Sequence, residues 1–410
     1  FRSPEIERAQ SNRPFWRLAI VEVIIMALTI GVAVALGRTP PPPNFSEQAG
    51  GEGLPSITQM QVKLGYNLEI PFGWEAMFTQ WRFDIFFGSA AIIAAWIYLY
   101  WLYLLKKRGG TWPLSNTLWW LAGCATLLFT SCSALGVYMP ALFSVHMIAH
   151  MLYSMGIPVM LVLGGPVTLA LRALKPAGRD GLPGIREWLV VFINNPVSRF
   201  LTHPVVATVQ FVAGFYLLYM TPIYDFLADE HAGHVFMNIH FLISGYIFYW
   251  VIIGVDAAPQ QIEPSVKLVT LMGSLPFHAW FGISLMQSQK VLAETYYASL
   301  DLPWAVNLLE DQNVGGAVAW AAGEVPLYIV TVALFVQWRR SDERDAARYD
   351  RVADRNNDEE LAAYNEMLAR MSQQVGVGGE DERDYYTSEV DAQHPVHMDN
   401  PIDASKRRGR

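Results

Sequence analysis

Long apolar segments recur along most of this 410-residue chain, and they constrain its fold more than any other feature. A helix needs about 20 mostly apolar residues to cross a bilayer, because its backbone polar groups must be paired within the segment. Segments of this kind lie at 16–37, 83–105, 116–137, 140–171, 204–224, 233–255, 265–287 and 314–338. The sequence therefore predicts an all-α, polytopic integral membrane helix bundle with about eight transmembrane helices.

Charged residues are scarce and unevenly placed, at 16% of the chain against about a quarter in soluble domains. The segment after residue 338 is dense in Arg, Asp and Glu, and such segments are usually solvated and disordered. We therefore predict a preceding transmembrane helix over 1–40, an extracytoplasmic Pro/Gly-rich loop over 41–82, a membrane bundle over 83–340 and a disordered, charged cytoplasmic tail over 341–410.

The loops that join the spans differ in their content of Lys and Arg. One side carries Lys106, Lys107, Arg108, Arg172, Lys175, Arg186 and Arg339, whereas the other has few basic residues. Basic residues mark the cytoplasmic side, so we expect a multi-pass protein of the bacterial plasma membrane with both termini in the cytoplasm. On that side, "PGIREWLVVFINNPVSRFLTHP" predicts a short amphipathic helix at the membrane surface.

Histidines gather in the outer halves of several spans. In the segment "FSVHMIAHMLYSMGIP", His146 and His150 lie four residues apart, on one face of a helix. With the expected orientation, His240 and His278 lie at a similar depth in two later spans. Ionisable residues inside a membrane are rare and functional by default, so this shared depth predicts a metal site near the extracytoplasmic side.

Imidazole and methionine thioether groups together suit Cu(I), a soft cation. The scarcity of carboxylates disfavours Mg²⁺, Ca²⁺ and Mn²⁺, and Zn²⁺ makes less use of Met. The predicted metal ligands are His146, His150, His240 and His278, with Met147, Met151, Met237, Met286 and His234 as further candidates. Histidine and methionine also serve as packing groups between helices, so a structural role for them stays open. Cys132 lies near this level, and we expect it to be a passive small residue.

Several blocks resemble the bacterial CtaG family of caa-type cytochrome c oxidase assembly factors. They are "WRFDIFFG", "LFSVHMIAHMLYSMGIPVMLVLGGPVTLALRAL", "HFLISGYIFYWVIIGVD", "PFHAWFGISLM" and "DQNVGGAVAWAAGEVPLYIVTVALFVQWRRSDER". They follow the family's order over about residues 60–350. The resemblance implies a seven-span bundle that supplies copper to the oxidase. His146 and His150 match its H-M-x-x-H pair, while His240 and His278 match its other two histidine blocks.

The first predicted span is additional to that seven-span core. It resembles the last helix of a CopD-like copper-resistance module that precedes the CtaG part in actinobacterial relatives. The resemblance therefore implies that such a module, or another copper donor, is a partner of this chain.

These observations lead to one hypothesis and several alternatives. We expect a copper-binding assembly factor, a metallochaperone that holds Cu(I) in the outer leaflet and supplies it to subunits of a haem–copper cytochrome c oxidase of the respiratory chain. The sequence has no catalytic triad, carboxylate pair, cofactor loop or nucleic-acid-binding pattern, so we expect neither an enzyme nor a nucleic-acid partner. The alternatives are a membrane haem protein, a copper permease and a structural accessory subunit of a respiratory complex that binds no metal.

Overall fold

A computed structural model of the chain describes residues 22–26, 29, 58–177, 183–254, 256, 257, 259, 262–355 and 359–377. Residues 22–26 and 29 are helical, but the rest of the predicted first span and residues 41–57 of the following loop lie outside the described residues. The chain divides into two units, Phe1–Trp338 and Arg339–Arg410, which are described separately. The described part of the chain is helical and contains no strand, which confirms the all-α prediction.

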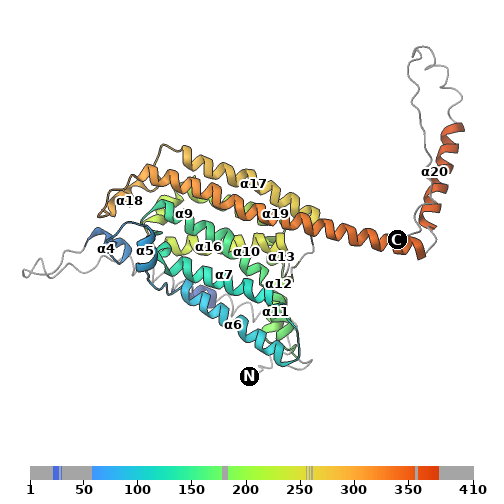
Figure 1. The fold of residues 1–410 in the computed structure, drawn as a ribbon, viewed down its shortest axis with the longest axis horizontal. Coiled ribbons are helices and arrows are strands. Elements are labelled where there is room, and N and C mark those ends of the chain that lie inside the picture. The colour runs from blue at the N-terminus through green and yellow to red at the C-terminus, as the bar shows by residue number, and fades with distance from the viewer. Residues whose placement is uncertain are drawn as a thin grey trace, which may run out of the picture. The chain divides into compact units, whose positions relative to one another are not determined.

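The first unit is a bundle of long helices (Figure 1). They are α6 (Phe87–Lys107), α7 (Leu114–Cys132), the consecutive segments α9 (Phe143–Met151), η1 (Leu152–Gly156) and α10 (Ile157–Leu163), then α14 (Pro204–Tyr219), α16 (His231–Ile253), α17 (Pro264–Gln287) and residues 308–338 of α19 (Leu308–Arg355). Among the described helices, five are long and apolar enough to cross a membrane: Phe87–Lys107, Phe143–Ala173, His231–Ile253, Pro264–Gln287 and Leu308–Val336. The apolar helix α14 is shorter, with 16 residues.

Short helices occupy the two ends of the bundle. Figure 1 shows α4 (Gln59–Leu64), α5 (Trp74–Thr79) and α18 (Glu294–Ser299) near one end. It shows α11 (Pro166–Ala173), α12 (Ile185–Asn194) and α13 (Pro196–Leu201) near the other. Two more join long helices: α8 (Ala134–Tyr138) precedes α9, and α15 (Ile223–Ala228) precedes α16. The predicted amphipathic segment forms α12 and α13, with Ile185, Trp188 and Phe192 exposed.

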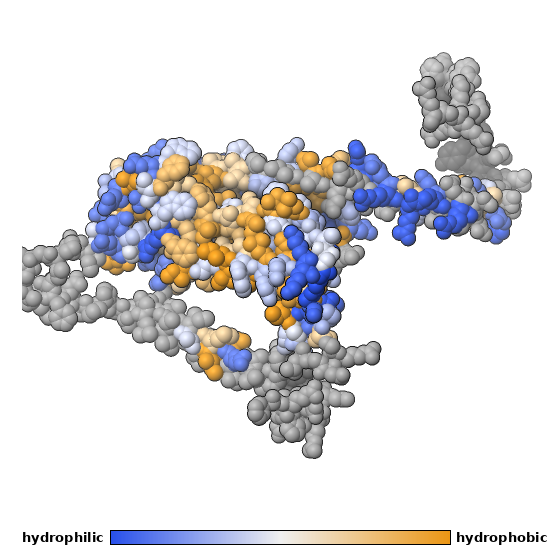
Figure 2. Space-filling model, turned by 60° about the horizontal axis from the view of Figure 1, so that its bottom comes forward, coloured by the Kyte–Doolittle hydropathy of each residue, from blue (hydrophilic) through white to orange (hydrophobic). Residues whose placement is uncertain are grey.

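The surface of the bundle is apolar over much of its length. Figure 2 shows hydrophobic residues gathered over its middle and hydrophilic ones at the end that carries α4 and α18. Exposed side chains of the long helices include Ile92, Trp96, Val209 and Val269. Such a surface is costly in water and is what lipid-facing helices present.

The helix that contains the two paired histidines is irregular one turn after them. Pro158 has no N–H to donate to the carbonyl of Ser154, and the backbone forms the π turn η1 there. A Cβ atom added at Gly245 of α16 would lie 2.0 Å from the Ser154 carbonyl oxygen, so this glycine admits the close approach. At this interruption α16 packs closely against the histidine-bearing helix.

The second unit differs from the sequence-based expectation of disorder. Residues 341–355 continue α19, and α20 spans Glu359–Val377. These stretches are rich in Ala, Arg and Glu, which are good helix formers. Ion pairs at i and i+4, such as Arg370 with Glu366, add to helix stability on an exposed surface. Residues after 377 lie outside the described part of the chain.

Candidate metal site

His146 and His150 pack against each other inside the bundle. Both residues are completely buried, and their ring centroids are 3.9 Å apart. Each ring also contacts the hydroxyl of Tyr219, the last residue of α14: His146 Nε2 is 2.9 Å from it and His150 Nδ1 is 2.6 Å from it. The i, i+4 spacing of the sequence thus becomes a buried pair of imidazoles joined by one phenol.

The shared phenol leaves one nitrogen of each imidazole without a partner. A hydroxyl has one proton, so Tyr219 donates to one ring and accepts an N–H from the other. The Met139 backbone lies beside His146, and the Asn238 side chain lies beside His150. Neither contact has hydrogen-bond geometry, and His146 Nδ1 and His150 Nε2 have no hydrogen-bond partner among the described residues.

A third histidine joins the pair from another helix. His234 lies in the first turn of α16, is buried, and has its ring centroid 5.8 Å from that of His146. Its Nδ1 is 3.4 Å from the Glu230 carbonyl oxygen, and its Nε2 has no partner within the described ranges. His146, His150 and His234, named here the histidine cluster, therefore present three unpaired buried nitrogens from two helices.

His240 and His278 are not part of this cluster. The Phe241 ring lies against both His150 and His240, with centroids 4.7 and 5.4 Å apart. His240 fills the space beside Gly214 of α14 and is half-buried. His278 Nε2 lies 3.0 Å from the Ala319 carbonyl oxygen, and its ring packs on Phe215. The four histidines predicted to form one metal site therefore do not meet: His146 and His150 lie together, whereas His240 and His278 lie apart from them.

The contact of His278 requires a glycine on the facing helix. A Cβ atom at Gly323 of α19 would lie 1.6 Å from His278 Nε2. We expect Gly323→Ala to displace His278 and lower the free energy of unfolding by about 1–3 kcal/mol, the usual cost of overpacking. Thermal unfolding in detergent measures this effect.

Gly273→Ala is the matched control, because a Cβ atom there meets nothing within 4 Å. It lies inside α17 and should be neutral or slightly stabilising, since alanine favours a helix. Equal stability of the two variants would contradict the close contact between His278 and Gly323.

Three of the four methionines expected near the site are buried core residues, whereas the fourth, Met286, is half-buried and lies against Gly316 of α19. Met147, Met151 and Met237 are each no more than 3% exposed. Met147 lies against Gly315 of α19, on a side of α9 that differs from that of the histidines. A different methionine, Met139, adjoins the cluster through its backbone, and its sulfur accepts a 3.8 Å contact from Asn238 Nδ2.

The helix that carries the pair is capped by a distant carboxylate. The residue before α9 is Leu142, which supplies no side-chain cap. Asp311, in the first turn of α19, instead accepts hydrogen bonds from the N–H groups of Phe143 (2.7 Å) and Ser144 (3.2 Å) and from the Ser144 hydroxyl. A carboxylate at a helix N-terminus satisfies free N–H groups and complements the helix dipole. Asp311 thereby fixes the start of α9, one turn before His146.

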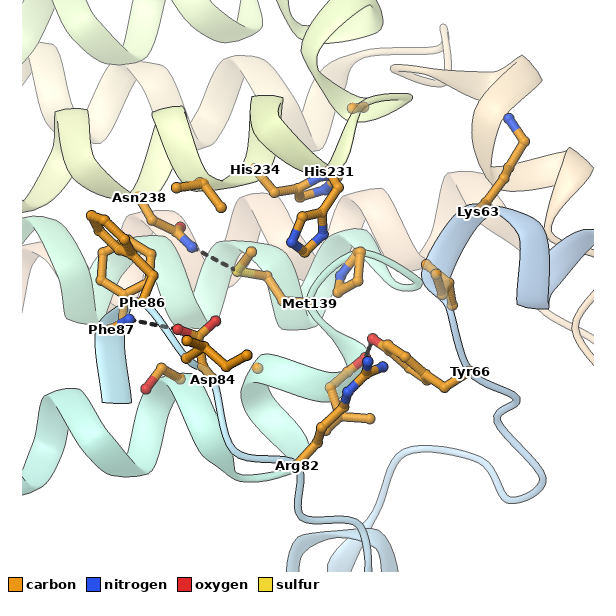
Figure 3. A pocket seen from close by; sticks show the side chains of 18 of the residues that line it. Lys63, Tyr66, Arg82, Asp84, Phe86, Phe87, Met139, His231, His234 and Asn238 are labelled. Atoms are coloured by element: carbon orange, nitrogen blue, oxygen red, sulfur yellow. Dashed lines mark hydrogen bonds between the residues drawn. The ribbon is translucent and has the colours of Figure 1, made fainter. Parts of the chain in front are cut away.

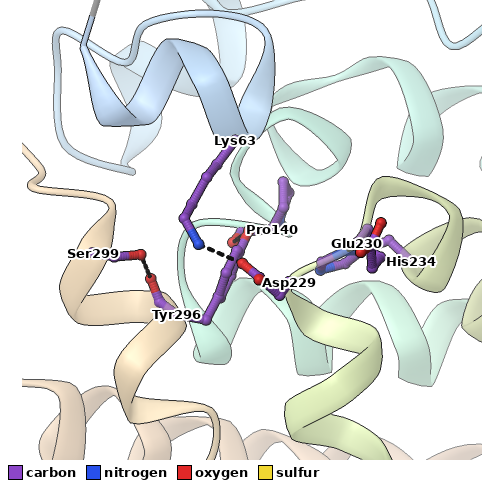
Figure 4. Close-up of polar contacts among 7 residues, drawn as sticks. All are labelled: Lys63, Pro140, Asp229, Glu230, His234, Tyr296 and Ser299. Atoms are coloured by element: carbon purple, nitrogen blue, oxygen red, sulfur yellow. Dashed lines mark hydrogen bonds and ion pairs between the residues drawn. The ribbon is translucent and has the colours of Figure 1, made fainter. Parts of the chain in front are cut away.

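A cavity of about 410 Å³ adjoins the histidine cluster. Figure 3 shows Met139, His234 and Asn238 along one side of it, with Arg82 and Asp84 on the other. The exposed residues at its rim include Arg82, Asp229 and His231. Lys63 of α4 forms an ion pair with Asp229 and lies over the Tyr296 ring, as Figure 4 shows. The cavity therefore runs from a charged rim to a buried floor beside the cluster.

The donor chemistry of the cluster fits a soft cation. Metal-bound imidazoles use one nitrogen for the metal and hydrogen-bond through the other, and Tyr219 and the Glu230 carbonyl occupy the second nitrogens here. Within the described residues, no group of three or more His, Cys, Asp or Glu side chains is arranged to hold a metal ion as it stands. The cluster is thus a set of free donors whose ligating arrangement requires side-chain adjustment.

Cys132 is engaged elsewhere. It is buried, its sulfur accepts a 3.3 Å contact from the backbone N–H of Asp84, and it lies close to Gly88 of α6. This thiol contributes to the junction of α6 and α7.

Comparison with known proteins shows the relationship of the chain. It is 47% identical over 317 residues to an "uncharacterized protein" of Mycobacterium leprae, and 46% identical over 318 residues to proteins of Mycobacterium bovis and Mycobacterium tuberculosis with the same description. Each match covers 77% of this chain and 48% of the relative, so the chain spans about half the length of the curated relatives it matches. No solved structure matches it. The model of the cytochrome c oxidase caa3 assembly factor family (Caa3_CtaG) matches residues 96–341, which include the whole histidine cluster, and the chain therefore belongs to that family.

Proposed function

We propose that this chain takes part in assembly of a caa3-type cytochrome c oxidase by holding Cu(I) at the histidine cluster and supplying it to the oxidase. One observation carries the proposal: three neighbouring buried imidazoles each have a nitrogen without a hydrogen-bond partner among the described residues. A buried polar group left unsatisfied costs about 1–3 kcal/mol. The presence of three such unsatisfied nitrogens in one cluster is explained if a ligand binds them while the protein functions.

The cargo we propose is monovalent copper. The donors are neutral imidazoles, which suit a soft cation, and the thioether sulfur of Met139 lies near the cluster without belonging to it. Copper here is cargo and passes through the site without a chemical reaction, so the chain acts as a metallochaperone and not as an enzyme. Its place would be the bacterial plasma membrane, with the cluster on the extracytoplasmic side, where an oxidase subunit or an upstream copper donor can meet it.

Each residue of the cluster has a part in this function. His146 and His150 are the deep ligands, and His234 is the ligand closer to the cavity. Tyr219 holds the first two rings in place through their other nitrogens. The contact between the rings of His146 and His150, at 3.9 Å, disfavours the haem alternative, because no porphyrin fits between them.

Copper retention tests the proposal. Detergent-purified protein is loaded with Cu(I) under reducing, anaerobic conditions, washed, and analysed by inductively coupled plasma mass spectrometry with a visible spectrum. We expect wild type to retain copper and His146→Ala/His150→Ala to lose it, because both deep ligands are gone. His240→Ala is the matched control, since this histidine lies outside the cluster, and it should retain copper.

Circular dichroism and size-exclusion chromatography establish that each variant is folded. Copper retained equally by the double variant would place the site elsewhere. Folded wild type without copper would contradict the proposal, and a Soret band in that preparation would favour a haem protein.

A further inference from the structure

We infer that Cu(I) reaches the histidine cluster through the cavity, and that the Met139 sulfur and His234 pass it across the cavity floor to His146 and His150. This inference rests on the proposed function and adds a route and a transfer ligand to it. Three features of the molecule support it: a gradient of exposure along the cavity, the position of the floor, and the chemistry of the groups that form it.

The cavity leads from solvent-accessible charged groups to buried neutral ones. Arg82, Asp229 and His231 are exposed at the rim. Met139, His234 and Asn238 line the floor, and each is only 5–6% exposed. The volume of about 410 Å³ is far larger than a bare ion needs, so the cavity has room for an ion with bound ligands or water.

The electrostatics of the rim suit a cation that arrives with its own ligands. Burial raises the pKa of the phenols of Tyr66 and Tyr296, so both stay protonated and neutral at physiological pH. The carboxylate of Asp229 is paired with Lys63. Asp84, which caps α6 by accepting from the Phe87 N–H, remains the carboxylate on the side of the cavity opposite His234. Among the described lining residues, Lys63 and Arg82 are balanced by Asp84 and Asp229, so no net positive charge repels a monovalent cation.

The side chains of Met139 and Asn238 meet at the floor of the cavity. Asn238 Nδ2 lies 3.8 Å from Met139 Sδ, and this contact closes the floor between the cavity and the pair. On the far side, the Met139 backbone adjoins His146 and the Asn238 side chain adjoins His150. Asn238 Oδ1 has no hydrogen-bond partner among the described residues, so this side chain is held by few polar contacts.

The groups at the floor can transfer the ion by ligand exchange. A methionine side chain has three rotatable bonds and a polarizable sulfur, which suits brief coordination of a soft ion. Cu(I) leaves its carrier for Met139 Sδ and the free Nε2 of His234, and then exchanges onto His146 Nδ1 and His150 Nε2. The ion remains Cu(I) throughout, so no electron donor or acceptor is required and each new bond replaces an old one.

The rate of loading tests the route separately from the affinity of the site. Cu(I) is presented as its bicinchoninate complex to wild type and to Met139→Leu in detergent, and the loss of the coloured complex is followed in a stopped-flow instrument. We expect Met139→Leu to load about tenfold more slowly, which corresponds to roughly 1.4 kcal/mol in the barrier. Its affinity at equilibrium should stay unchanged, because the final ligands remain.

Met155→Leu is the matched control. This variant also replaces a buried methionine with leucine. Met155 lies in η1, after the two histidines, and does not line the cavity. A second variant, Val235→Cys, places a thiol in the cavity wall, whereas both native cysteines are buried. Treatment of Val235→Cys with a methanethiosulfonate reagent should slow loading, and treated wild type should load normally.

The outcomes separate the two proposals. Wild-type rates in both Met139→Leu and blocked Val235→Cys, with copper bound normally, overturn the route and leave the proposed function intact. An equal loss of affinity and rate in Met139→Leu would make Met139 a ligand of the final site and overturn its role in transfer. Wild type that takes up no copper overturns both proposals.

Discussion

Loss of the Tyr219 hydroxyl is expected to weaken both the fold and the metal site. Tyr219→Phe keeps the buried ring but removes the hydrogen bonds to His146 Nε2 and His150 Nδ1. Two further imidazole nitrogens then lack partners in a completely buried position, at about 1–3 kcal/mol each. We expect the free energy of unfolding to fall by roughly 2–4 kcal/mol. Copper affinity should fall by about 10–100-fold, as is usual when a group that orients metal ligands is lost.

Tyr249→Phe provides the matched control for this substitution. Tyr249 is also completely buried, and its hydroxyl has no hydrogen-bond partner within the described residues. Removing that hydroxyl should therefore be neutral or stabilising. Thermal unfolding in detergent and competition with a Cu(I) chelator give the two quantities. A Tyr219→Phe protein as stable and as tight-binding as Tyr249→Phe would show that the phenol does not organise the pair.

Asp311→Ala is the second substitution with a large expected effect. It removes a carboxylate that accepts from two backbone N–H groups and from the Ser144 hydroxyl at the start of α9. Loss of a helix cap costs about 0.5–2 kcal/mol, and hydrogen bonds to a charged group contribute about 1.5–3 kcal/mol. We expect destabilisation by about 3 kcal/mol, together with weaker copper retention because His146 lies in the turn that loses its anchor.

Two variants accompany this measurement. Asp311→Asn keeps one oxygen acceptor and should recover part of the stability and of the copper retention. Glu310→Ala removes the exposed carboxylate next in sequence and should change neither. If the Asp311→Ala and Glu310→Ala proteins unfold at the same temperature, the proposed anchoring of α9 is wrong.

The sequence predicts the depth of a residue in the bundle better than its direction. His146 and His150 share a helix, so the spacing of four residues was enough to place them together. His240 and His278 lie on other helices, and the rotation of each helix is set by side-chain packing with its neighbours. In the structure, Phe215 and Phe241 occupy the space beside these two histidines, and glycines on the facing helices admit their rings.

Three residues that adjoin the candidate site escaped the sequence analysis. Tyr219 is the final residue of α14, and its partners lie 69 and 73 residues away in sequence. Met139 lies outside the long apolar helices, at the end of α8, so it shares no helical spacing with the other methionines. Asn238 is a single polar residue within α16 and belongs to no histidine or methionine pattern. For Tyr219 and Met139, the signal that could have indicated them is their position at helix ends, on the side where the histidines gather.

The pattern of apolar segments predicted the long helices well, whereas their ends depended on local chemistry. The fourth span is interrupted by η1 because Pro158 follows, and Gly165 adopts a left-handed conformation before α11 begins. The span predicted over 204–224 ends at Tyr219 as a helix of 16 residues. Hydropathy averages over such features, so it locates a span and leaves its boundaries undetermined.

Two helices are capped by carboxylates that lie far along the chain, and this determines when their surroundings can form during biosynthesis. Asp311 comes 168 residues after Phe143, and Asp256 caps α11 in the same manner from 88 and 89 residues downstream. While the ribosome is still making the intervening helices, the first turn of α9 has neither carboxylate partner nor neighbouring α19. A nascent chain therefore cannot complete the surroundings of His146 and His150 until its last long helix has begun to emerge.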